Sequence, residues 1–209
     1  TVLTVAGGHV RIGANAGSVS NVLAVGDGAL LAVTNLNALI GIGYKNSFAT
    51  FTNSAAGGSN NVLRVNNGSV NIEASGGTLM VGYGGTLSVS GCQSSIKMMN
   101  LYLGWGAVLE TTIDSTGPSD PIQVSGSTIF HQAAAGDSSP SYTAVKINAR
   151  DYQQSGGGWV VLLTNKTQNI SGKIDGMKSV LPKGAVLVQE PRYVAVYIPS
   201  TKGTVIRLQ

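Results

Sequence analysis

A short pattern that recurs along the chain constrains its fold more than any other feature. In the stretch 79–89, Leu-Met-Val-Gly-Tyr-Gly-Gly-Thr-Leu-Ser-Val, an alternating apolar pair leads into a glycine-rich corner, and a second alternating pair follows. Alternation with a period of two is typical of a β-strand with one buried face. The stretch therefore predicts two strands joined by a tight corner.

Seven copies of the apolar pair can be aligned: Leu3/Val5, Leu23/Val25, Ile40/Ile42, Leu63/Val65, Leu79/Val81, Leu101/Leu103 and Ile122/Val124. They follow one another in steps of 16 to 23 residues, and a mean step of about 20 residues indicates a repeat architecture. A longer echo accompanies them, because Asn21-Val-Leu-Ala-Val and Asn61-Val-Leu-Arg-Val lie 40 residues apart. We interpret this distance as two coils.

The composition agrees with a stack of short strands. Glycine accounts for 29 of 209 residues, and the chain is 43% hydrophobic but only 11% charged. Glycine is favoured at corners that need a positive φ, and no window carries a convincing helical stripe. We therefore predict an all-β, right-handed parallel β-helix with coils of about 20 residues, formed by residues 1–132.

The composition changes after Phe130. A loop rich in small residues and proline is predicted at 133–141, followed by longer strands at 142–149, 159–164, 185–189, 193–198 and 204–208. The last coil of a solenoid has an open edge that must be covered. Residues 142–209 are therefore predicted to form irregular final coils and a C-terminal β cap.

Several motifs resemble those of one family. They are Val-Gly-Tyr-Gly-Gly-Thr-Leu-Ser-Val at 81–89, Trp-Val-Val-Leu-Leu-Thr at 159–164, Ile-Ser-Gly-Lys-Ile-Asp-Gly at 170–176, Leu-Pro-Lys-Gly-Ala-Val-Leu-Val at 181–188 and Tyr-Val-Ala-Val-Tyr at 193–197. These motifs resemble bacterial secreted proteins with autotransporter-associated β-strand repeats. The resemblance implies an extracellular β-helix that acts as a passenger stalk or adhesin, secreted or at the bacterial cell surface. It offers no catalytic residue to carry over.

Charge and hydropathy narrow the range of partners. The net charge of +4 contains no basic run, whereas nucleic-acid binding needs clustered Lys and Arg. No apolar stretch reaches the ~18 residues of a membrane-spanning helix. We therefore expect no nucleic acid, no membrane span in these residues, and a surface glycan or a host or cell-surface component as partner. The start at Thr1 suggests a piece of a longer parent, which is expected to carry an anchor or translocator.

Residues that could perform chemistry are scattered. Enzymatic β-helices of the pectin-lyase-like type need clustered carboxylates, together with a basic residue near the reacting carbon. Glu110 and Asp114 are close in sequence, but the turn expected between them favours two solvated surface groups. His9 and His131 are too far apart for a shared metal. We therefore predict no catalytic residue, no metal and no cofactor.

The most suggestive constellation is aromatic. Tyr44, Asn67, Tyr83 and Trp105 each stand two positions after the aligned apolar residue, which would make Tyr83 and Trp105 vertical neighbours. Such rings can form a stacked structural ladder or an exposed platform for sugar rings. We take these four residues as the candidate glycan-binding strip.

Two functions are compatible with this pattern. The first is a non-enzymatic extracellular structural or adhesive β-helix module, similar to the surface stalk of an autotransporter passenger. The alternative is a carbohydrate-binding or polysaccharide-degrading β-helix of the pectin-lyase-like type. A groove with several acids and a base would favour the enzyme, and a flat aromatic row without acids would favour binding alone.

Overall fold

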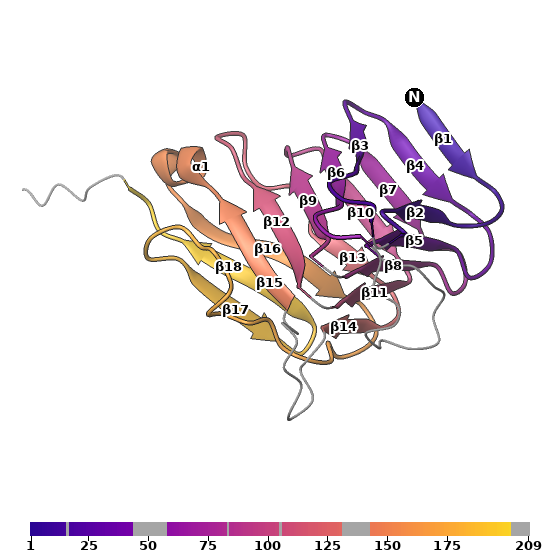
Figure 1. Ribbon diagram of the computed structural model, residues 1–209. Coiled ribbons are helices and arrows are strands. Elements are labelled where there is room, and N and C mark those ends of the chain that lie inside the picture. The colour runs from indigo at the N-terminus through magenta and orange to yellow at the C-terminus, as the bar shows by residue number, and fades with distance from the viewer. Residues whose placement is uncertain (16, 44–57, 83, 105, 131–142, 202–209) are drawn as a thin grey trace, which may run out of the picture.

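The computed structural model describes residues 1–15, 17–43, 58–82, 84–104, 106–130 and 143–201. Within them the chain forms three β-sheets and a short helix, α1 (Arg150–Ser155) (Figure 1). Sheet A contains β1 (Val2–Val5), β4 (Leu30–Val33), β7 (Ser69–Ile72), β10 (Ser95–Met98), β13 (Ile122–Val124), β16 (Gly158–Asn165), β18 (Tyr193–Ile198) and β17 (Val186–Glu190), in that spatial order.

The other two sheets contain five strands each. Sheet B contains β14 (Thr128–Phe130), β11 (Asn100–Leu103), β8 (Thr78–Val81), β5 (Leu39–Ile42) and β2 (Val10–Ile12). Sheet C contains β15 (Thr143–Asn148), β12 (Ala107–Thr112), β9 (Thr86–Ser90), β6 (Val62–Asn66) and β3 (Val22–Gly26).

The chain visits the three sheets in turn. β1 lies in sheet A, β2 in sheet B and β3 in sheet C, and β4 then returns to sheet A beside β1. This order continues as far as β16, and every pairing among these strands is parallel. We call one passage through sheets A, B and C a circuit. The prediction of an all-β fold is confirmed, and three parallel sheets visited in turn are consistent with a parallel solenoid.

The circuits are longer than the sequence suggested. Paired positions lie 22 residues apart between Leu79 and Leu101, close to the predicted step, but 28 apart between Leu3 and Leu31 and 41 apart between Ile122 and Leu163. A regular period of about 20 residues is therefore wrong. The seven aligned pairs come from all three sheets, because a strand facing the core carries the same alternation in each of them. Val22 pairs directly with Val62. The 40-residue echo therefore spans one circuit, not two.

Inward-facing side chains stack in columns between the sheets. In sheet B, Ile42, Val81 and Leu103 are in register, and none is more than 1% exposed. The residues predicted to face inward are all buried: Leu63, Val65, Leu79, Val81, Leu101 and Leu103. The first two belong to sheet C and the other four to sheet B. Burying each such side chain contributes about 1.5–3 kcal/mol, so the columns are the main source of stability.

Buried asparagine side chains tie the corners of neighbouring circuits together. The Asn61 side chain is fully buried and donates to the carbonyls of Gly58 at 2.6 Å and Ser18 at 2.9 Å. Its Oδ1 accepts from the backbone and side-chain nitrogens of Asn21 at 3.0 and 2.8 Å. Buried polar groups need such partners, so the two copies of the echo are joined by hydrogen bonds.

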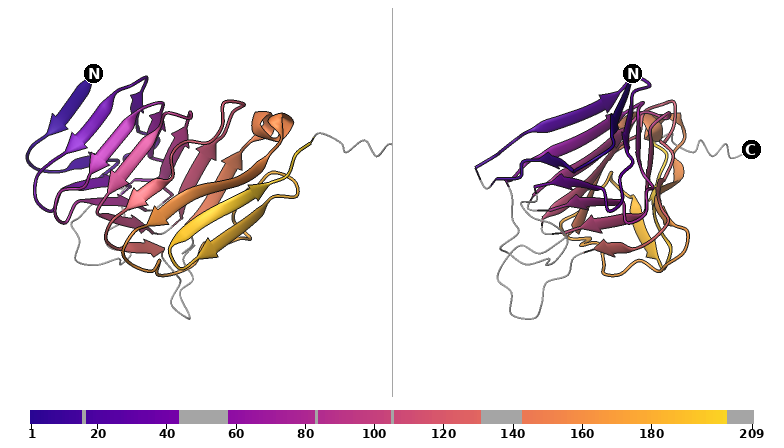
Figure 2. Two further views of the ribbon diagram at one scale, coloured as in Figure 1. Left: turned by 180° about the vertical axis from the view of Figure 1, so that it is seen from behind. Right: turned by 90° about the vertical axis from the view of Figure 1, so that its right-hand side faces the viewer.

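The C-terminal region continues the circuits and then departs from them. β15 and β16 still pair in parallel with β12 and β13. The segment 166–185 then runs along the edges of sheets B and C. There Ser171 forms a bridge with Ile129 of β14, and Val180 forms one with Lys146 of β15. Finally, β17 turns back into β18, which inserts between β16 and β17 with antiparallel pairing on both sides (Figures 1 and 2).

Most of the elements expected in this region are present. Strands occur at four of the five predicted positions, as β15 to β18. The predicted loop at 133–141 and the strand at 204–208 lie outside the described residues. The helix α1 was not predicted, because six residues are too few to carry a helical stripe. In the described residues no helix has the length and hydropathy that a membrane crossing would need.

Candidate functional site

The outer surface of sheet C carries rows of polar side chains that follow neighbouring strands in register. Residues that alternate with the buried columns point outward and form three in-register rows, with strands about 4.8 Å apart. We call this surface the sheet C face. Its charged row is Arg64, Ser88, Glu110 and Lys146; its polar row is Asn66, Ser90, Thr112 and Asn148; its third row is Val62, Thr86, Val108 and Ala144. Ser88 and Ala144 are covered by their neighbours and are buried.

An ion pair lies within the charged row. Lys146 Nζ is 2.7 Å from Glu110 Oε1, and the two side chains are 54% and 26% exposed. Partial burial raises the pKa of Glu110, but the hydrogen bond and charge of Lys146, aided by the Ser88 hydroxyl and the Arg64 guanidinium, hold it below its ordinary value. Glu110 is therefore a stable carboxylate at neutral pH. A general acid would need the opposite shift.

Asp114 lies in a separate environment and does not act together with Glu110. Its Oδ1 accepts hydrogen bonds from the hydroxyl and backbone nitrogen of Thr116, the latter at 2.8 Å, and these bonds lower its pKa. Asp114 also forms an antiparallel bridge with Gly117. The carboxylate thus closes a turn after β12, while Glu110 points outward from the sheet.

The polar row contains amide and hydroxyl groups, and two of its members are joined by a hydrogen bond. Ser90 Oγ donates to Asn66 Oδ1 at 3.2 Å, across neighbouring strands. Asn66 and Asn148 are exposed, and Thr112 is half-buried. Such a row can offer donors and acceptors at regular spacing to an extended polar ligand.

Three of the four predicted glycan-binding residues, Tyr44, Tyr83 and Trp105, lie outside the described residues. The strands that precede them, β5, β8 and β11, are neighbours in sheet B. Asn67 follows β6 of sheet C instead, so it belongs to a different corner. It adopts a φ of 49°, and its Oδ1 accepts from the backbone nitrogen of Gln93 at 3.3 Å. The sequence alignment grouped them because it did not separate the sheets.

A different aromatic pair lies exposed on the C-terminal strands. Trp159 of β16 and Tyr197 of β18 pair across the sheet, with ring centroids 5.4 Å apart and planes inclined by 54°. They are 61% and 38% exposed. The alternation in Tyr-Val-Ala-Val-Tyr at 193–197 signals that Tyr197 shares a face with Tyr193. Sequence reasoning missed the pair because the antiparallel insertion of β18 beside β16 could not be foreseen.

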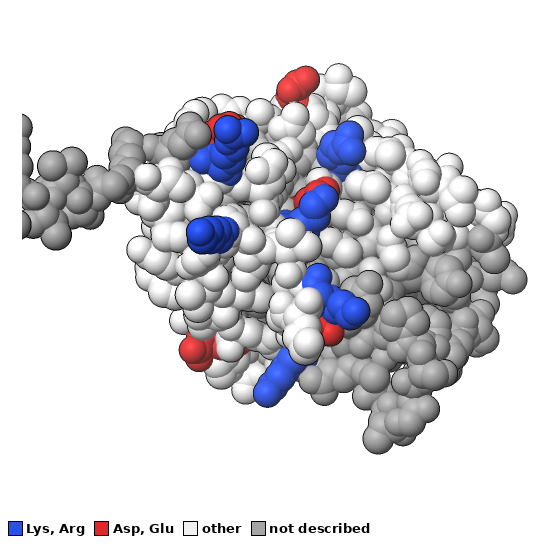
Figure 3. All heavy atoms as spheres, turned by 60° about the vertical axis from the view of Figure 1, so that its left-hand side comes forward, with Lys and Arg blue, Asp and Glu red and all other residues white. Residues whose placement is uncertain are grey.

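Charged groups on the described surface are sparse and mixed in sign. Figure 3 shows acidic and basic side chains interspersed among wide uncharged areas. Among the described residues, no group of three or more His, Cys, Asp and Glu side chains is placed to hold a metal ion.

The fold and this face define a mostly β protein of three parallel sheets, with a charged row and a polar row in register on the outside of sheet C. No protein-family model, curated protein or solved structure matches the chain.

Proposed function

We propose that the chain is a non-enzymatic structural and adhesive module, a right-handed parallel β-helix that works outside the cell or at the bacterial cell surface. The observation that carries the proposal is the sheet C face, where charged and polar rows follow consecutive strands in register. Its acid, Glu110, is held by Lys146 at 2.7 Å. A surface of this kind suits repeated weak contacts along a partner, as a stalk or adhesin makes.

A second candidate function is carbohydrate binding, with a surface glycan as the partner. The amide and hydroxyl groups of the polar row match the hydroxyl groups of a sugar chain in hydrogen-bonding character. The exposed rings of Trp159 and Tyr197 supply the kind of apolar surface on which a sugar ring stacks. Polysaccharide degradation is the less favoured version, because the pKa of Glu110 is shifted away from that of a proton donor.

Glycan binding and polysaccharide turnover, measured together, test both candidates. The informative variant combines Asn66→Ala, Thr112→Ala and Asn148→Ala, which removes three of the four polar side chains of the polar row. The matched control combines Asn71→Ala, Gln123→Ala and Thr164→Ala, which occupy one outward row of sheet A. The proposal expects the first variant to lose binding while the control retains it, with no turnover by any form. Glycan binding by neither parent nor control would contradict the carbohydrate-binding candidate, and depolymerisation would contradict the non-enzymatic role.

A further inference from the structure

The outward side of β16, β18 and β17, which lie side by side in Figure 1, carries aromatic and apolar side chains in register. We call it the C-terminal face. Its three rows, each running from β16 through β18 to β17, are Trp159, Tyr197 and Val186; Val161, Ala195 and Val188; and Thr164, Tyr193 and Glu190. Trp159 and Val186 are 61% and 54% exposed. A contiguous patch of such side chains, unlike single exposed ones, indicates an interaction surface.

The same side of sheet A is polar on the strands that precede these three. β7, β10 and β13 present outward the polar side chains of Ser69, Asn71, Ser95, Lys97 and Gln123. The sheet therefore forms with polar residues at its outward positions. Rings and valines on β16, β18 and β17 are not required by the strand pairing, so they point to a partner.

Basic side chains border the C-terminal face at both ends of its strands. Lys166 follows β16 directly, and Arg192 stands in the turn between β17 and β18, where its carbonyl accepts from the backbone nitrogen of Asn165 at 2.8 Å. At the other end, Lys183 lies in the turn that precedes β17. All three basic residues are exposed. Glu190 is the one acid in the three rows, so the border is basic overall.

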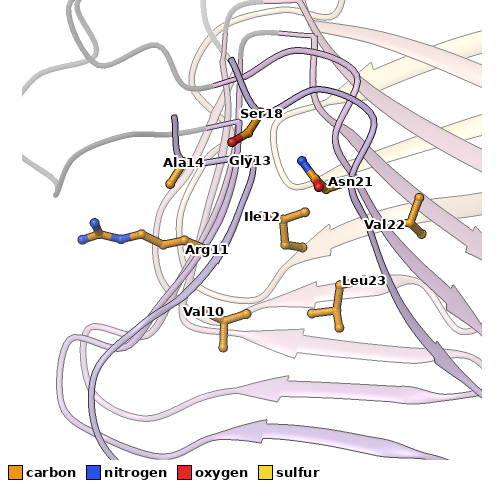
Figure 4. Close-up of a pocket in the computed structure, with 9 residues that line it drawn as sticks. All are labelled: Val10, Arg11, Ile12, Gly13, Ala14, Ser18, Asn21, Val22 and Leu23. Carbon is orange, nitrogen blue, oxygen red and sulfur yellow. The ribbon is translucent and has the colours of Figure 1, made fainter. Parts of the chain in front are cut away.

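The hollow between β2 and β3 lacks this complement of charge. Val10, Ile12 and Leu23 point into it, whereas Arg11 points away from it (Figure 4). Apolar side chains alone do not indicate the chemistry of a ligand. The C-terminal face combines apolar side chains with a basic border, and this combination does.

We propose that the C-terminal face binds the surface of an anionic phospholipid bilayer. The rings of Trp159, Tyr193 and Tyr197 are apolar bodies with polar tips, and such rings favour the headgroup region of a bilayer. Lysine and arginine attract anionic headgroups while their stems lie along apolar surface. The valines between the rings offer no flat face on which a sugar could stack, which favours a lipid over a glycan here. This contact lies outside the sheet C face, so it can fail while the proposed function stands.

Co-sedimentation of the whole chain with phosphatidylcholine vesicles, with and without phosphatidylglycerol, tests the proposal. We expect binding only to vesicles that contain phosphatidylglycerol. Binding should weaken when NaCl is raised from about 0.1 M to about 1 M, because salt screens the charges. Lys183→Glu should weaken it about fivefold or more, and Trp159→Ser about tenfold. Arg192→Glu repeats the charge reversal at the other end of the face.

Two control variants make comparable changes at exposed positions outside the face. Arg11→Glu reverses one charge, and Leu36→Ser removes an apolar side chain that is 73% exposed. Both should bind vesicles like the parent. Circular dichroism checks that every variant keeps its strands.

The fluorescence of Trp159 locates the contact on the protein. Its emission should shift to shorter wavelength when phosphatidylglycerol vesicles are added, because the ring enters a less polar environment. The shift should be absent from Trp159→Phe, which keeps an aromatic ring at this position and should still bind.

Three results would overturn the proposal. The first is no binding to phosphatidylglycerol vesicles at low salt; if Trp159→Ser then abolishes binding to soluble hydroxyethylcellulose, the face holds a glycan instead. The second is equal weakening by Lys183→Glu and Arg11→Glu, which would mean that net charge alone attracts the chain. The third is vesicle binding without a change in the emission of Trp159, which would place the contact elsewhere.

Discussion

The first circuit and the middle circuits carry the same sequence pattern but differ in burial. Leu3-Thr-Val5 and Leu63-Arg-Val65 have the same alternation. Leu3 is 56% exposed, whereas Leu63 and Val65 are fully buried. The difference comes from the neighbours, since β6 lies between two strands and β1 lies beside one. Stability in such a stack is therefore supplied by the interfaces between circuits, as expected for repeat proteins.

The largest difference in the free energy of unfolding should come from placing a charge in a middle circuit and, separately, in the first circuit. Val81→Asp buries an unpaired carboxylate between β5 and β11, and we expect a loss of about 4 kcal/mol or more. Leu3→Asp at the half-open end should cost less than about 1 kcal/mol, because water still reaches the side chain. Urea unfolding measures both. Equal losses would mean that burial does not depend on the position in the stack.

Asn21 and Asn61, which begin the two similar segments 40 residues apart, should also differ in how much stability is lost when each is replaced by alanine. Asn61→Ala removes the partner of the Gly58 and Ser18 carbonyls and should destabilise the chain by about 2 kcal/mol. Asn21→Ala removes one side-chain bond from an exposed residue and should cost less than about 1 kcal/mol. Thermal melts of the two variants compare them, and the reverse order would contradict the assigned roles.

Alanine substitutions at two glycines of the first circuit should show a smaller difference in stability. Gly13 has a φ of 68°, and a Cβ there would lie 2.0 Å from Nδ2 of Asn61. Gly13→Ala should therefore cost about 1.5 kcal/mol through strain and displacement of the amide. Gly7 has nothing within 4 Å, so Gly7→Ala should change stability by less than about 0.5 kcal/mol. Chemical denaturation of both variants is the measurement; a neutral Gly13→Ala would contradict the close contact.

The smallest expected effect concerns the ion pair of the sheet C face. The pKa of Glu110 is lowered by folding, so its contribution to stability is present above the ordinary value of 4.5 and is lost as pH falls through the folded-state pKa. The pair is partly exposed, and its contribution should be below about 1 kcal/mol. Glu110→Gln should reduce the slope of stability against pH in this acidic range. An unchanged slope would contradict the assigned ion pair.

Much of the fold could be predicted from the sequence, because alternation and glycine corners are local properties. The inward direction of Leu63 and Val65, on either side of the exposed Arg64, follows from alternation alone. The length of a circuit could not be predicted in this way, since strands of sheets A, B and C carry the same pattern. The direct pairing of Val22 with Val62 is a property of the three-dimensional stack.

Less of the candidate site could be predicted. Grouping Asn67 with the aromatic residues depended on the incorrect period, and the pairing within the stack separates it from β5, β8 and β11. The approach of Lys146 to Glu110 joins residues 36 positions apart and requires the pairing of β12 with β15. A charge of either sign in an exposed strand position is common, so the sequence did not link Glu110 with Lys146.

The pairing of the 40-residue echo tests the central claim most directly. Ala24 and Arg64 are paired outward residues of β3 and β6, and both are exposed. In a Cys92→Ser background, Ala24→Cys/Arg64→Cys should form a disulfide under mild oxidation, because adjacent strands are about 4.8 Å apart and disulfides need Cα atoms within about 7 Å. Ala24→Cys/Ser88→Cys, which spans two circuits, should not. Crosslinking of the second pair in place of the first would contradict the three-sheet circuit.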